Sequence, residues 1–527
     1  MKSDRAARRL SWISGLVLSA SACGGSTMEN GMPPVDQRLE VRTAQGVVRG
    51  RMQDGSRAFL GIAYAAPPVG ENRFRAPQPP ASYTAVFEAS EYGPACPQLA
   101  KDKLDASTSE DCLTLNIWAP AKDATPRPVM VFVHGGGFNS GSGSLPLYEG
   151  THLSATQDVA VVTLNYRLGP LGFFSHTALR TEERSGTGGG NFGLLDQQAA
   201  LSWVHDNIAA FGGDAKNVTL FGESAGGMSV CYQLLSPKSA GLFHRAIVQS
   251  GPCSTLVPPT QSESEAQGDV LATQVGCAAG DAQATLRCLR QVPLAKLMTA
   301  LPLKPEIIFG SGYAWTPSVG NDVLPMPPQA AFSAGRFHRM PIVVGANKDE
   351  GTAFVALGVK LDTEAEIRTA LASLFPPPAV DAVIRHYGST PIGADTGLRV
   401  LGDAFVCDAR RLARWTSTVV PTFYYHFTRE FAYLLPNLGA FHGAELPYLF
   451  HTPLEFVTIK PHEEGFSAQL QSLWARFAAT GNPNGMANVD WPAYDRIGDR
   501  SLRLDLETRS ETGLRRADCD FWDMLLP

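Results

Sequence analysis

The stretch Asn217–Met228, NVTLFGESAGGM, decides the fold of this chain. It begins with an apolar, β-branched run, passes through the turn Gly222-Glu223-Ser224-Ala225-Gly226, and ends in small residues that can open a helix. The turn fits G-x-S-x-G, a strained strand-to-helix turn that exposes a serine hydroxyl at the edge of a sheet. Glycine on each side lets backbone pass close to backbone, where a Cβ would clash. A solvated turn is the alternative, so partners elsewhere in the chain must decide whether Ser224 is a nucleophile.

A second glycine-rich segment could supply hydrogen-bond donors for an oxyanion. The residues His134-Gly135-Gly136-Gly137-Phe138 directly follow the apolar run Val129–Val133. A loop of the HGGG type after a strand presents backbone N–H groups to a developing negative charge. An ordinary glycine hinge is the alternative. We expect His134 itself to be structural.

Apolar runs bounded by glycine or proline recur along the chain and predict strands buried on both faces. They are Val129–Val133, Val159–Leu164, Val218–Phe221, Ala246–Val248, Ile342–Val344 and Thr422–Tyr425. Helical periodicity predicts helices over Phe192–Phe211 and Phe466–Thr480, and turn signals within Val41–Ala65 predict small antiparallel strands. The alternation of strand and helix predicts the α/β class, with a large, mostly parallel sheet covered by helices on both faces.

Composition narrows the classes of partner. The chain has 527 residues, of which 44% are hydrophobic and 18% charged, with a net charge of −6. Charges of both signs are interspersed without a basic patch, so we expect no nucleic-acid partner. No C-x-x-C spacing of a zinc site occurs, and we expect neither a metal nor an organic cofactor.

The first residues indicate export. Residues 1–22 contain a basic region followed by the apolar Leu10–Ala22, which is too short to span a membrane and is typical of a signal peptide. The sequence from Leu18 to Ser26 resembles a bacterial lipobox, in which Cys23 becomes the lipidated N-terminus, although Ala20 stands where leucine is commonest. We expect a lipoprotein rather than simple secretion, with residues 23–34 as a flexible tether and residues 35–527 as a single domain. A lipid anchor would then be the only contact with a membrane.

An activated serine also needs a base and an acid that orients it. The loop after Ile342–Val344 offers two adjacent carboxylates, Asp349 and Glu350, and chemistry alone does not choose between them. Five later histidines are candidates for the base: His386, His426, His442, His451 and His462. His442 is favoured because it lies in an apolar, glycine-flanked loop after a late strand. His426 lies within a strand run and His462 in a charged loop, so both are expected to be structural.

In these residues and in two longer motifs, the chain resembles the type-B carboxylesterase and cholinesterase family over nearly all of its mature length. Phe211-Gly212-Gly213 through Gly226 matches the serine signature of that family, and Glu110–Pro120, EDCLTLNIWAP, matches its second signature. The resemblance implies the α/β-hydrolase fold and a catalytic triad of Ser224, His442 as general base and Glu350 as acid. The choice of Glu350 over Asp349 comes from the resemblance alone.

The resemblance also assigns supporting residues. It places the oxyanion-hole amides at Gly136, Gly137 and Ala225. It implies the disulfides Cys96–Cys112, Cys277–Cys288 and Cys407–Cys519. Cys231 and Cys253 are left over, and we expect them to be buried, inert thiols. Arg73 with Glu110, and Arg167 with Asp196, resemble structural ion pairs of the family and receive no catalytic role.

Two departures from the family bear on specificity. Cholinesterases hold quaternary ammonium on a tryptophan inside a long loop closed by the first disulfide, by cation–π attraction. The 15 residues between Cys96 and Cys112 include no aromatic residue, so we expect the choline site to be missing. Glu223 matches a family position that could tune His442 or favour a cationic group; a buried hydrogen-bonded carboxylate is the alternative. The segment Phe309–Trp315, with Tyr313 and Trp315, predicts a roomier acyl pocket.

The sequence as a whole predicts an exported serine carboxylesterase that hydrolyses small-molecule esters through an acyl-enzyme. An amidase or a lipase of the same fold is the second hypothesis. A non-catalytic adhesion or binding member of the family is the third, and the filled triad positions argue against it. Export would place the protein in the periplasm, on the outer membrane through its lipid, or outside the cell.

Overall fold

The fold was analysed in a computed structural model, which describes residues 37–100, 103–121, 126–182, 189–278, 280–301, 315–372, 375–388, 392–430, 438–452, 458–486 and 489–526. Residues Arg38–Pro527 form one structural unit, and all that follows concerns this unit. The expected signal peptide, Cys23 and the tether lie outside the described residues.

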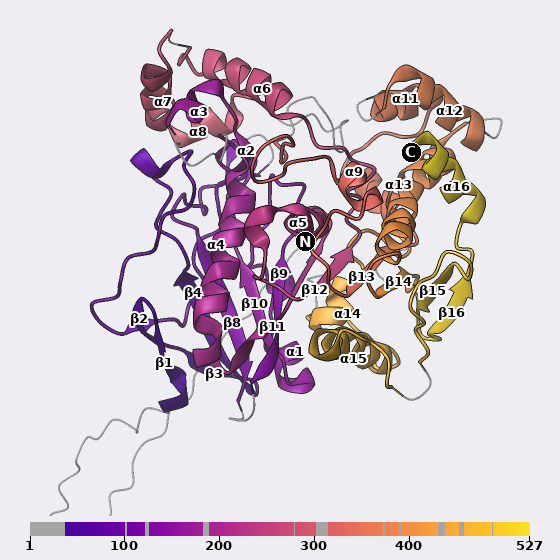
Figure 1. The fold of residues 1–527 in the computed structure, drawn as a ribbon, viewed down its shortest axis with the longest axis horizontal. Coiled ribbons are helices and arrows are strands. Elements are labelled where there is room, and N and C mark those ends of the chain that lie inside the picture. Colours follow the sequence, from indigo (N-terminus) through magenta and orange to yellow (C-terminus); the bar gives the residue numbers. More distant parts are fainter. Residues whose placement is uncertain are drawn as a thin grey trace, which may run out of the picture. The chain divides into compact units, whose positions relative to one another are not determined.

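In the described residues, one mixed sheet of eleven strands organises the unit (Figure 1). Its strands are β3 (Arg51–Gln53), β4 (Ser56–Ala63), β8 (Thr114–Pro120), β9 (Arg127–Val133), β10 (Ala160–Leu164), β11 (Gly213–Glu223), β12 (Arg245–Gln249), β13 (Ile342–Asn347), β14 (Thr422–Phe427), β15 (Arg500–Leu504) and β16 (Arg509–Thr512). Their order across the sheet is β16-β15-β14-β13-β12-β11-β9-β10-β8-β4-β3. Neighbours from β15 to β10 run parallel, whereas β16 and the strands from β8 to β3 pair antiparallel.

Two small sheets accompany the large one. The strands β1 (Glu40–Thr43) and β2 (Gly46–Arg49) pair antiparallel, and β5 (Phe87–Glu88) runs parallel to β2. A short hairpin joins β6 (Leu99–Ala100) to β7 (Lys103–Leu104). The expected antiparallel strands near the N-terminus are thus divided between sheets, because β3 and β4 extend the large one.

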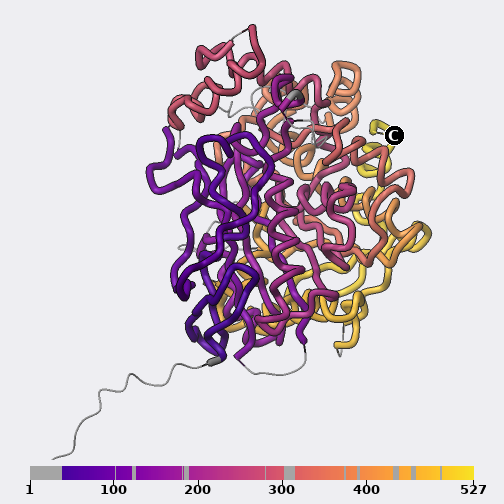
Figure 2. Tube along the Cα trace, turned by 60° about the vertical axis from the view of Figure 1, so that its left-hand side comes forward, coloured from indigo at the N-terminus to yellow at the C-terminus, as the bar shows by residue number. Residues whose placement is uncertain are grey.

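Helices connect most of the strands. They are α1 (Thr151–Gln157), α2 (Gly169–Phe173), α3 (Thr177–Glu182), α4 (Phe192–Asn207), α5 (Ala225–Leu235), α6 (Gln261–Gln274), α7 (Ala282–Gln291), α8 (Leu294–Thr299), α9 (Pro328–Ser333), α10 (Glu350–Ala356), α11 (Glu364–Ala372), α12 (Pro377–Tyr387), α13 (Ala394–Thr416), α14 (Leu446–Phe450), α15 (Glu464–Thr480) and α16 (Arg516–Leu525). Helices α3 and α6–α8 lie together at the top of both views (Figures 1 and 2).

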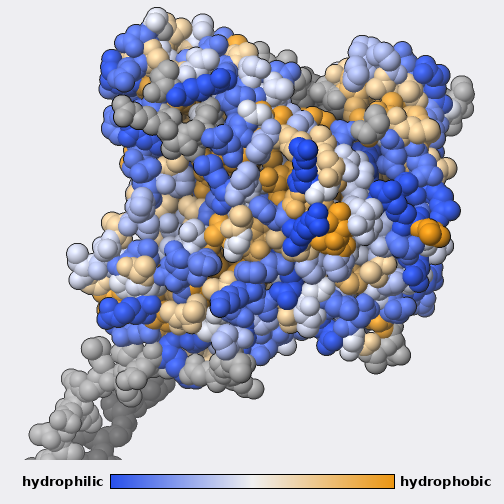
Figure 3. All heavy atoms as spheres, viewed as in Figure 1, coloured by the Kyte–Doolittle hydropathy of each residue, from blue (hydrophilic) through white to orange (hydrophobic). Residues whose placement is uncertain are grey.

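Strand β9 shows why the sheet is covered on both faces. Val129, Val131 and Val133 point into one hydrophobic core, whereas Met130 and Phe132 point into a second. Successive side chains of a strand alternate between faces, so an uninterrupted apolar strand must be buried on both sides. Helices α4, α5 and α13 pack on the first face, and α1 and α15 on the second. Hydrophilic side chains cover most of the face shown in Figure 3, with apolar ones gathered near its middle.

Each of the six predicted buried strands is present, as β9 to β14. The first predicted helix is α4 continued by a 3-10 turn, Ile208–Phe211, and the second is α15. The sequence interpretation did not identify β8, β15 and β16 as strands or α13 as a helix.

Disulfide pairing confirms three expectations and overturns one. The pairs Cys96–Cys112, Cys277–Cys288 and Cys407–Cys519 are formed. The prediction that Cys231 and Cys253 are free thiols is wrong, because these residues form a fourth disulfide, with their Cα atoms 6.5 Å apart. Parallel pairing of β11 with β12 explains this: Cys231 lies in the helix after β11 and Cys253 in the loop after β12, so both lie beyond the same edge of the sheet.

Buried ion pairs fix the connections around the sheet. Arg167 pairs with Asp196 at 2.7 Å and Arg73 with Glu110 at 2.5 Å, as the family resemblance implied. Near the C-terminus, Arg515 pairs with Asp403 of α13 and donates from Nη2 to the carbonyl oxygen of Lys348 at 2.9 Å. Together with the Cys407–Cys519 disulfide, this arginine ties the start of α16 to α13 and to the end of β13.

Candidate active site

Ser224 occupies a strained turn between β11 and α5. Its backbone adopts φ 58° and ψ −124°, a left-handed φ that a non-glycine residue rarely takes. A Cβ on Gly222 would lie 2.5 Å from the carbonyl carbon of Gly226, and a Cβ on Gly226 would collide with the carbonyl oxygen of Val133. Glycine is therefore required on both sides of Ser224, as the sequence predicted. The turn places Ser224 at the N-terminal end of α5.

The glycine-rich loop after β9 lies against this turn. A Cβ on Gly135 would be 3.0 Å from the Cβ of Ser224. Gly136 and Gly137 both have positive φ, 99° and 61°, and their N–H groups have no acceptor among the described residues. A Cβ on Gly137 would meet no atom within 4 Å, so this part of the loop borders open space. Two unpaired amides therefore lie in a loop that contacts the turn of Ser224.

His134 lies beneath that loop. Its ring stacks on Tyr166 with centroids 4.4 Å apart, and Nδ1 contacts the carbonyl oxygen of Gly135 at 2.9 Å. Burial lowers the pKa of His134 to about 4, so the ring is neutral near pH 7. These contacts are consistent with the structural role that the sequence predicted.

Glu350 begins α10 directly after β13, and its carboxylate is fully buried. One oxygen, Oε2, lies 2.5 Å from Nδ1 of His442. The other, Oε1, accepts from the Ser250 hydroxyl at 2.6 Å and from the Asn347 backbone N–H at 2.7 Å. Both oxygens are held, so the carboxylate has one fixed orientation toward the imidazole.

Asp349 points elsewhere. Its Oδ2 accepts from the backbone N–H of Ala440 at 2.9 Å, and its own N–H donates to the carbonyl oxygen of Ala440 at 3.0 Å. Of the two adjacent carboxylates that the sequence left open, Glu350 contacts the imidazole of His442, and Asp349 contacts the backbone of the loop that carries it.

His442 lies between two carboxylates. While Nδ1 faces Glu350, Nε2 lies 3.2 Å from Oε1 of Glu223, the residue before Ser224. Nε2 has no hydrogen-bond partner among the described residues, and no hydrogen bond joins it to the Ser224 hydroxyl in this state. Such bonds are often long in ligand-free enzymes and tighten when substrate binds. The rings of Phe354 and Phe405 pack beside the imidazole, with centroids 4.9 and 5.1 Å away.

Electrostatics couples these groups. Burial alone would lower the pKa of His442. The carboxylates of Glu223 and Glu350 raise this pKa by a larger amount, so that the net pKa is about 9. Burial raises the pKa of Glu223 to about 8, against the opposing effect of His442. Because Nε2 of His442 and Oε1 of Glu223 lie 3.2 Å apart, the gain or loss of a proton by one group changes the pKa of the other.

The other histidines lie in different surroundings. His426 is buried in β14, and His462 is exposed. His386 pairs with Asp518 at 2.9 Å and His451 with Glu464 at 2.7 Å.

Three polar residues of the site were not singled out from the sequence: Ser250, Asn347 and Glu445. Ser250, with φ 47°, holds Glu350, and Asn347 donates from Nδ2 to the carbonyl oxygen of Phe441 at 2.8 Å and to Glu445 at 2.7 Å. Ser250 and Asn347 stand at or just past the ends of two predicted parallel strands, where catalytic loops gather. Their position at these strand ends is the feature by which the sequence could have identified them.

The predicted pocket residues are only partly described. Trp315 is buried near Phe174, with ring centroids 6.4 Å apart, and its carbonyl oxygen accepts from Asn139 at 3.4 Å. Tyr313 and the rest of Phe309–Ala314 lie outside the described residues. In the parts of the chain that the structure describes, no group of three or more His, Cys, Asp or Glu side chains could hold a metal ion.

A strained serine turn between strand and helix, on a largely parallel sheet with a carboxylate-paired histidine nearby, defines the class of serine hydrolases with the α/β-hydrolase fold. The chain belongs to the carboxylesterase family, whose model matches residues 37–522. It is therefore a carboxylic ester hydrolase of the type-B carboxylesterase class, and its substrates are small-molecule esters.

Similar proteins agree with this assignment. The para-nitrobenzyl esterase of Bacillus subtilis (strain 168) is 37% identical over 484 residues, covering 89% of this chain and 96% of that protein. The acetylcholinesterase of Bungarus fasciatus is 34% identical over 534 residues, covering 93% of this chain and 86% of that protein. A solved structure of PNB esterase superposes with a TM-score of 0.81 at 34% identity, covering 92% of this chain and all of that one.

Two observations bear on location. Four disulfides suggest an extracellular or exported protein, because such bonds persist in oxidising compartments. Among the helices of the described residues, none has the length and apolar character needed to cross a membrane.

Proposed function

We propose that this enzyme hydrolyses carboxylic esters through an acyl-enzyme formed on Ser224, with His442 as general base and Glu350 as the acid that orients it. The observation that carries the proposal is the 2.5 Å contact between Glu350 and Nδ1 of His442, which directs Nε2 toward the residues around Ser224. A carboxylate at Nδ1 fixes the tautomer whose Nε2 accepts a proton, and stabilises the imidazolium that results.

The reaction has two halves. His442 takes the proton of Ser224 as its oxygen attacks the ester carbonyl, and then gives that proton to the leaving alcohol. In the second half, His442 takes a proton from water as the water oxygen attacks the acyl carbonyl, and gives that proton to the Ser224 oxygen as its bond to the acyl group breaks and the acid leaves. The N–H groups of Gly136, Gly137 and Ala225 hold the oxyanion in both halves; the removal of one such donor costs roughly 10²–10³ in kcat.

The decisive test compares two serine variants. We expect Ser224→Ala to lower p-nitrophenyl acetate hydrolysis by at least about 10⁴-fold, because the nucleophile is lost. Ser262→Ala, at an exposed serine of α6, serves as the control and should keep wild-type kcat/KM. Unchanged thermal unfolding would show that both variants fold. A burst of p-nitrophenol from Ser224→Ala would refute the assignment.

Substrate class is tested by a matched series of one ester, the corresponding amide and an emulsified triglyceride. We expect the ester in solution to be turned over fastest. Faster hydrolysis of the amide, or activation at the lipid interface, would favour the amidase or lipase alternative.

We also propose that the mature protein is a lipoprotein anchored through Cys23. The proposal rests on the lipobox-like sequence that ends at Cys23. Mass spectrometry of the mature N-terminus distinguishes the outcomes: a diacylglyceryl modification supports the anchor, and an unmodified N-terminus supports simple secretion.

A further inference from the structure

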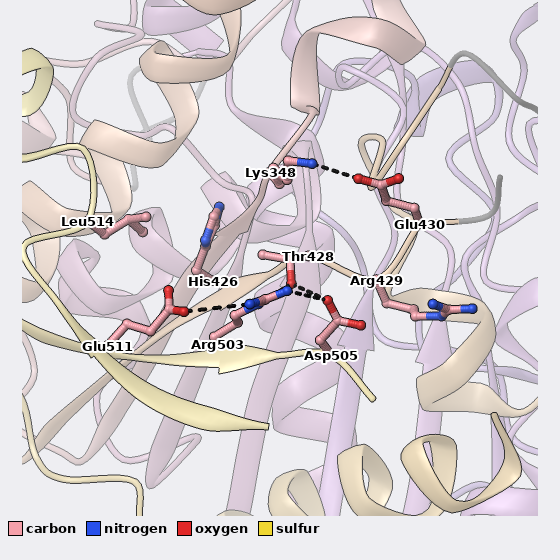
Figure 4. A pocket seen from close by; sticks show the side chains of 9 residues that line it. All are labelled: Lys348, His426, Thr428, Arg429, Glu430, Arg503, Asp505, Glu511 and Leu514. Carbon is pink, nitrogen blue, oxygen red and sulfur yellow. Dashed lines mark hydrogen bonds and ion pairs between the residues drawn. The ribbon is translucent and has the colours of Figure 1, made fainter. Parts of the chain in front are cut away.

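A polar cavity lies apart from Ser224, at the carboxyl ends of three adjacent strands (Figure 4). Its volume is about 330 Å³, and Lys348, Thr428 and Asp505 mark the ends of β13, β14 and β15 there. Open α/β sheets bind ligands outside the carboxyl ends of their strands. The position therefore suits a small ligand, although none of the catalytic residues proposed above lines this cavity.

The inner wall of the cavity contains a histidine whose ring nitrogens have no hydrogen-bond partner in the described part of the chain. His426 projects from β14, and its side chain reaches between Lys348 and Arg503 (Figure 4). Only 6% of His426 is exposed, and neither Nδ1 nor Nε2 makes a hydrogen bond with any described residue. Buried polar atoms almost always have partners, because an unmade hydrogen bond costs free energy. A molecule bound beside the ring would satisfy this unmade hydrogen bond.

The charges that act on this histidine are positive. Burial, and then Arg515, Lys348 and Arg503, lower the pKa of His426 to about 3, so the ring is neutral near pH 7 and keeps one N–H donor. Arg503 lies directly across from His426 in the pairing of β14 with β15. Of these cations, Lys348 and Arg503 line the cavity, together with the carboxylates of Glu430, Asp505 and Glu511.

Arg503 and Lys348 each keep hydrogen-bond donors that their ion pairs do not use. Arg503 uses Nη2 for Asp505 at 2.9 Å and Nε for Thr428 at 3.0 Å, but Nη1 is 3.8 Å from Glu511, beyond hydrogen-bond distance. Lys348 donates to Glu430 at 2.6 Å, which uses one of its three protons.

Arg429 contributes less to the cavity. Its guanidinium points away from the other lining side chains (Figure 4) and pairs with Glu463 at 2.6 Å. The donors available to a ligand are therefore those of His426, Lys348 and Arg503.

We propose that this cavity is a binding site for a small carboxylate, which accepts from the His426 ring N–H and from Nη1 of Arg503, with Lys348 beside it. Hydrogen bonds from cations to carboxylates are short and strong, and a two-carbon acid fits the volume. The proposal concerns binding apart from Ser224 and does not rest on the esterase mechanism; only the blocking step of the test uses the reactivity of Ser224.

The test is calorimetric titration of the purified mature protein with sodium acetate, against sodium chloride at equal ionic strength. Ser224 is first blocked with an organophosphonate, so that acetate cannot report on the catalytic centre. We expect saturable binding that His426→Phe and Arg503→Gln each weaken by roughly tenfold or more. His205→Gln, at an exposed histidine of α4, is the matched control and should bind acetate as the wild type does.

A crystal structure with acetate gives the second readout and decides the question even if His426→Phe fails to fold. Acetate contacting His426 and Arg503 supports the proposal. Water alone in the cavity, no saturable acetate binding, or equal affinity in Arg503→Gln and the wild type would each overturn it.

Discussion

Asp349 and Glu350 show how adjacent carboxylates take separate roles. Glu350 contacts the imidazole of His442, whereas Asp349 makes two hydrogen bonds to the backbone of Ala440, two residues before it. A Cβ on Gly439 would overlap the Asp349 carboxylate, so the two loops meet closely. The backbone contact gives Asp349 a positioning role for the loop of the proposed base.

The first prediction concerns this contact. Asp349→Ala removes the acceptor for the Ala440 N–H and should lower kcat about three- to tenfold, in line with a net contribution of about 1 kcal/mol for one hydrogen bond. Asp349→Asn keeps an acceptor oxygen and should restore most of kcat. Steady-state kinetics on p-nitrophenyl acetate separates kcat from KM. Equal activity of the Ala variant and the wild type would contradict the role.

Glu223 should set the pH dependence. A general base works when neutral, so activity rises as pH increases through the pKa of His442. The carboxylate of Glu223 raises that pKa, and Glu223→Gln removes the charge. We therefore expect the acidic limb of the kcat/KM profile to move to lower pH in Glu223→Gln. A limb that stays in place, or moves to higher pH, would show that Glu223 does not act on His442 through its charge.

At the level of single residues, the sequence predicted one part of the site and left another part open. Motif spacing located Ser224 and the glycine loop, since the local backbone alone demands those residues. It did not separate Asp349 from Glu350, because the direction of each side chain depends on which loop packs against it. The role of Ser250 in holding Glu350 likewise depends on the neighbouring strand β13, which lies about 100 residues away in the sequence.

At the scale of elements, apolar runs predicted the parallel strands because those strands are buried on both faces. Helix α13 was not predicted, because its buried face carries charged residues as well as apolar ones. It buries Asp403, Asp408, Arg410 and Arg411, whose partners lie elsewhere in the sequence, such as Asp499 for Arg410 and Asp523 for Arg411. Buried charges interrupt the apolar periodicity on which a sequence-based prediction of a helix rests.

The Cys231–Cys253 disulfide gives a prediction at the same scale. A native disulfide typically contributes about 2–4 kcal/mol, so Cys231→Ala/Cys253→Ala should lower Tm while leaving kcat near the wild-type value. Alkylation of the denatured, unreduced protein, followed by peptide mass spectrometry, checks the bond directly. Alkylated Cys231 and Cys253 in the wild type would restore the thiol interpretation.

For the whole molecule, family membership establishes ester hydrolysis but not the preferred alcohol. The first disulfide closes a short loop, and the residues between Cys96 and Cys112 include no aromatic side chain that could hold a quaternary ammonium. We expect kcat/KM for acetylcholine to be well below that for an uncharged acetate ester of similar size, measured on the same preparation. A preference for acetylcholine would show that another part of the site binds the cation.

The tie between Arg515 and the end of β13 has a consequence for biosynthesis. All three residues of the proposed triad have been synthesised once the ribosome passes codon 442. Arg515, which donates to the carbonyl oxygen of Lys348, and Cys519, which pairs with Cys407, come more than 70 residues later. Two strands of the main sheet, β15 and β16, are also still to come. A nascent chain should therefore stay catalytically silent until the segment from Arg500 to Cys519 has been synthesised and has folded onto the strands and helices that precede it.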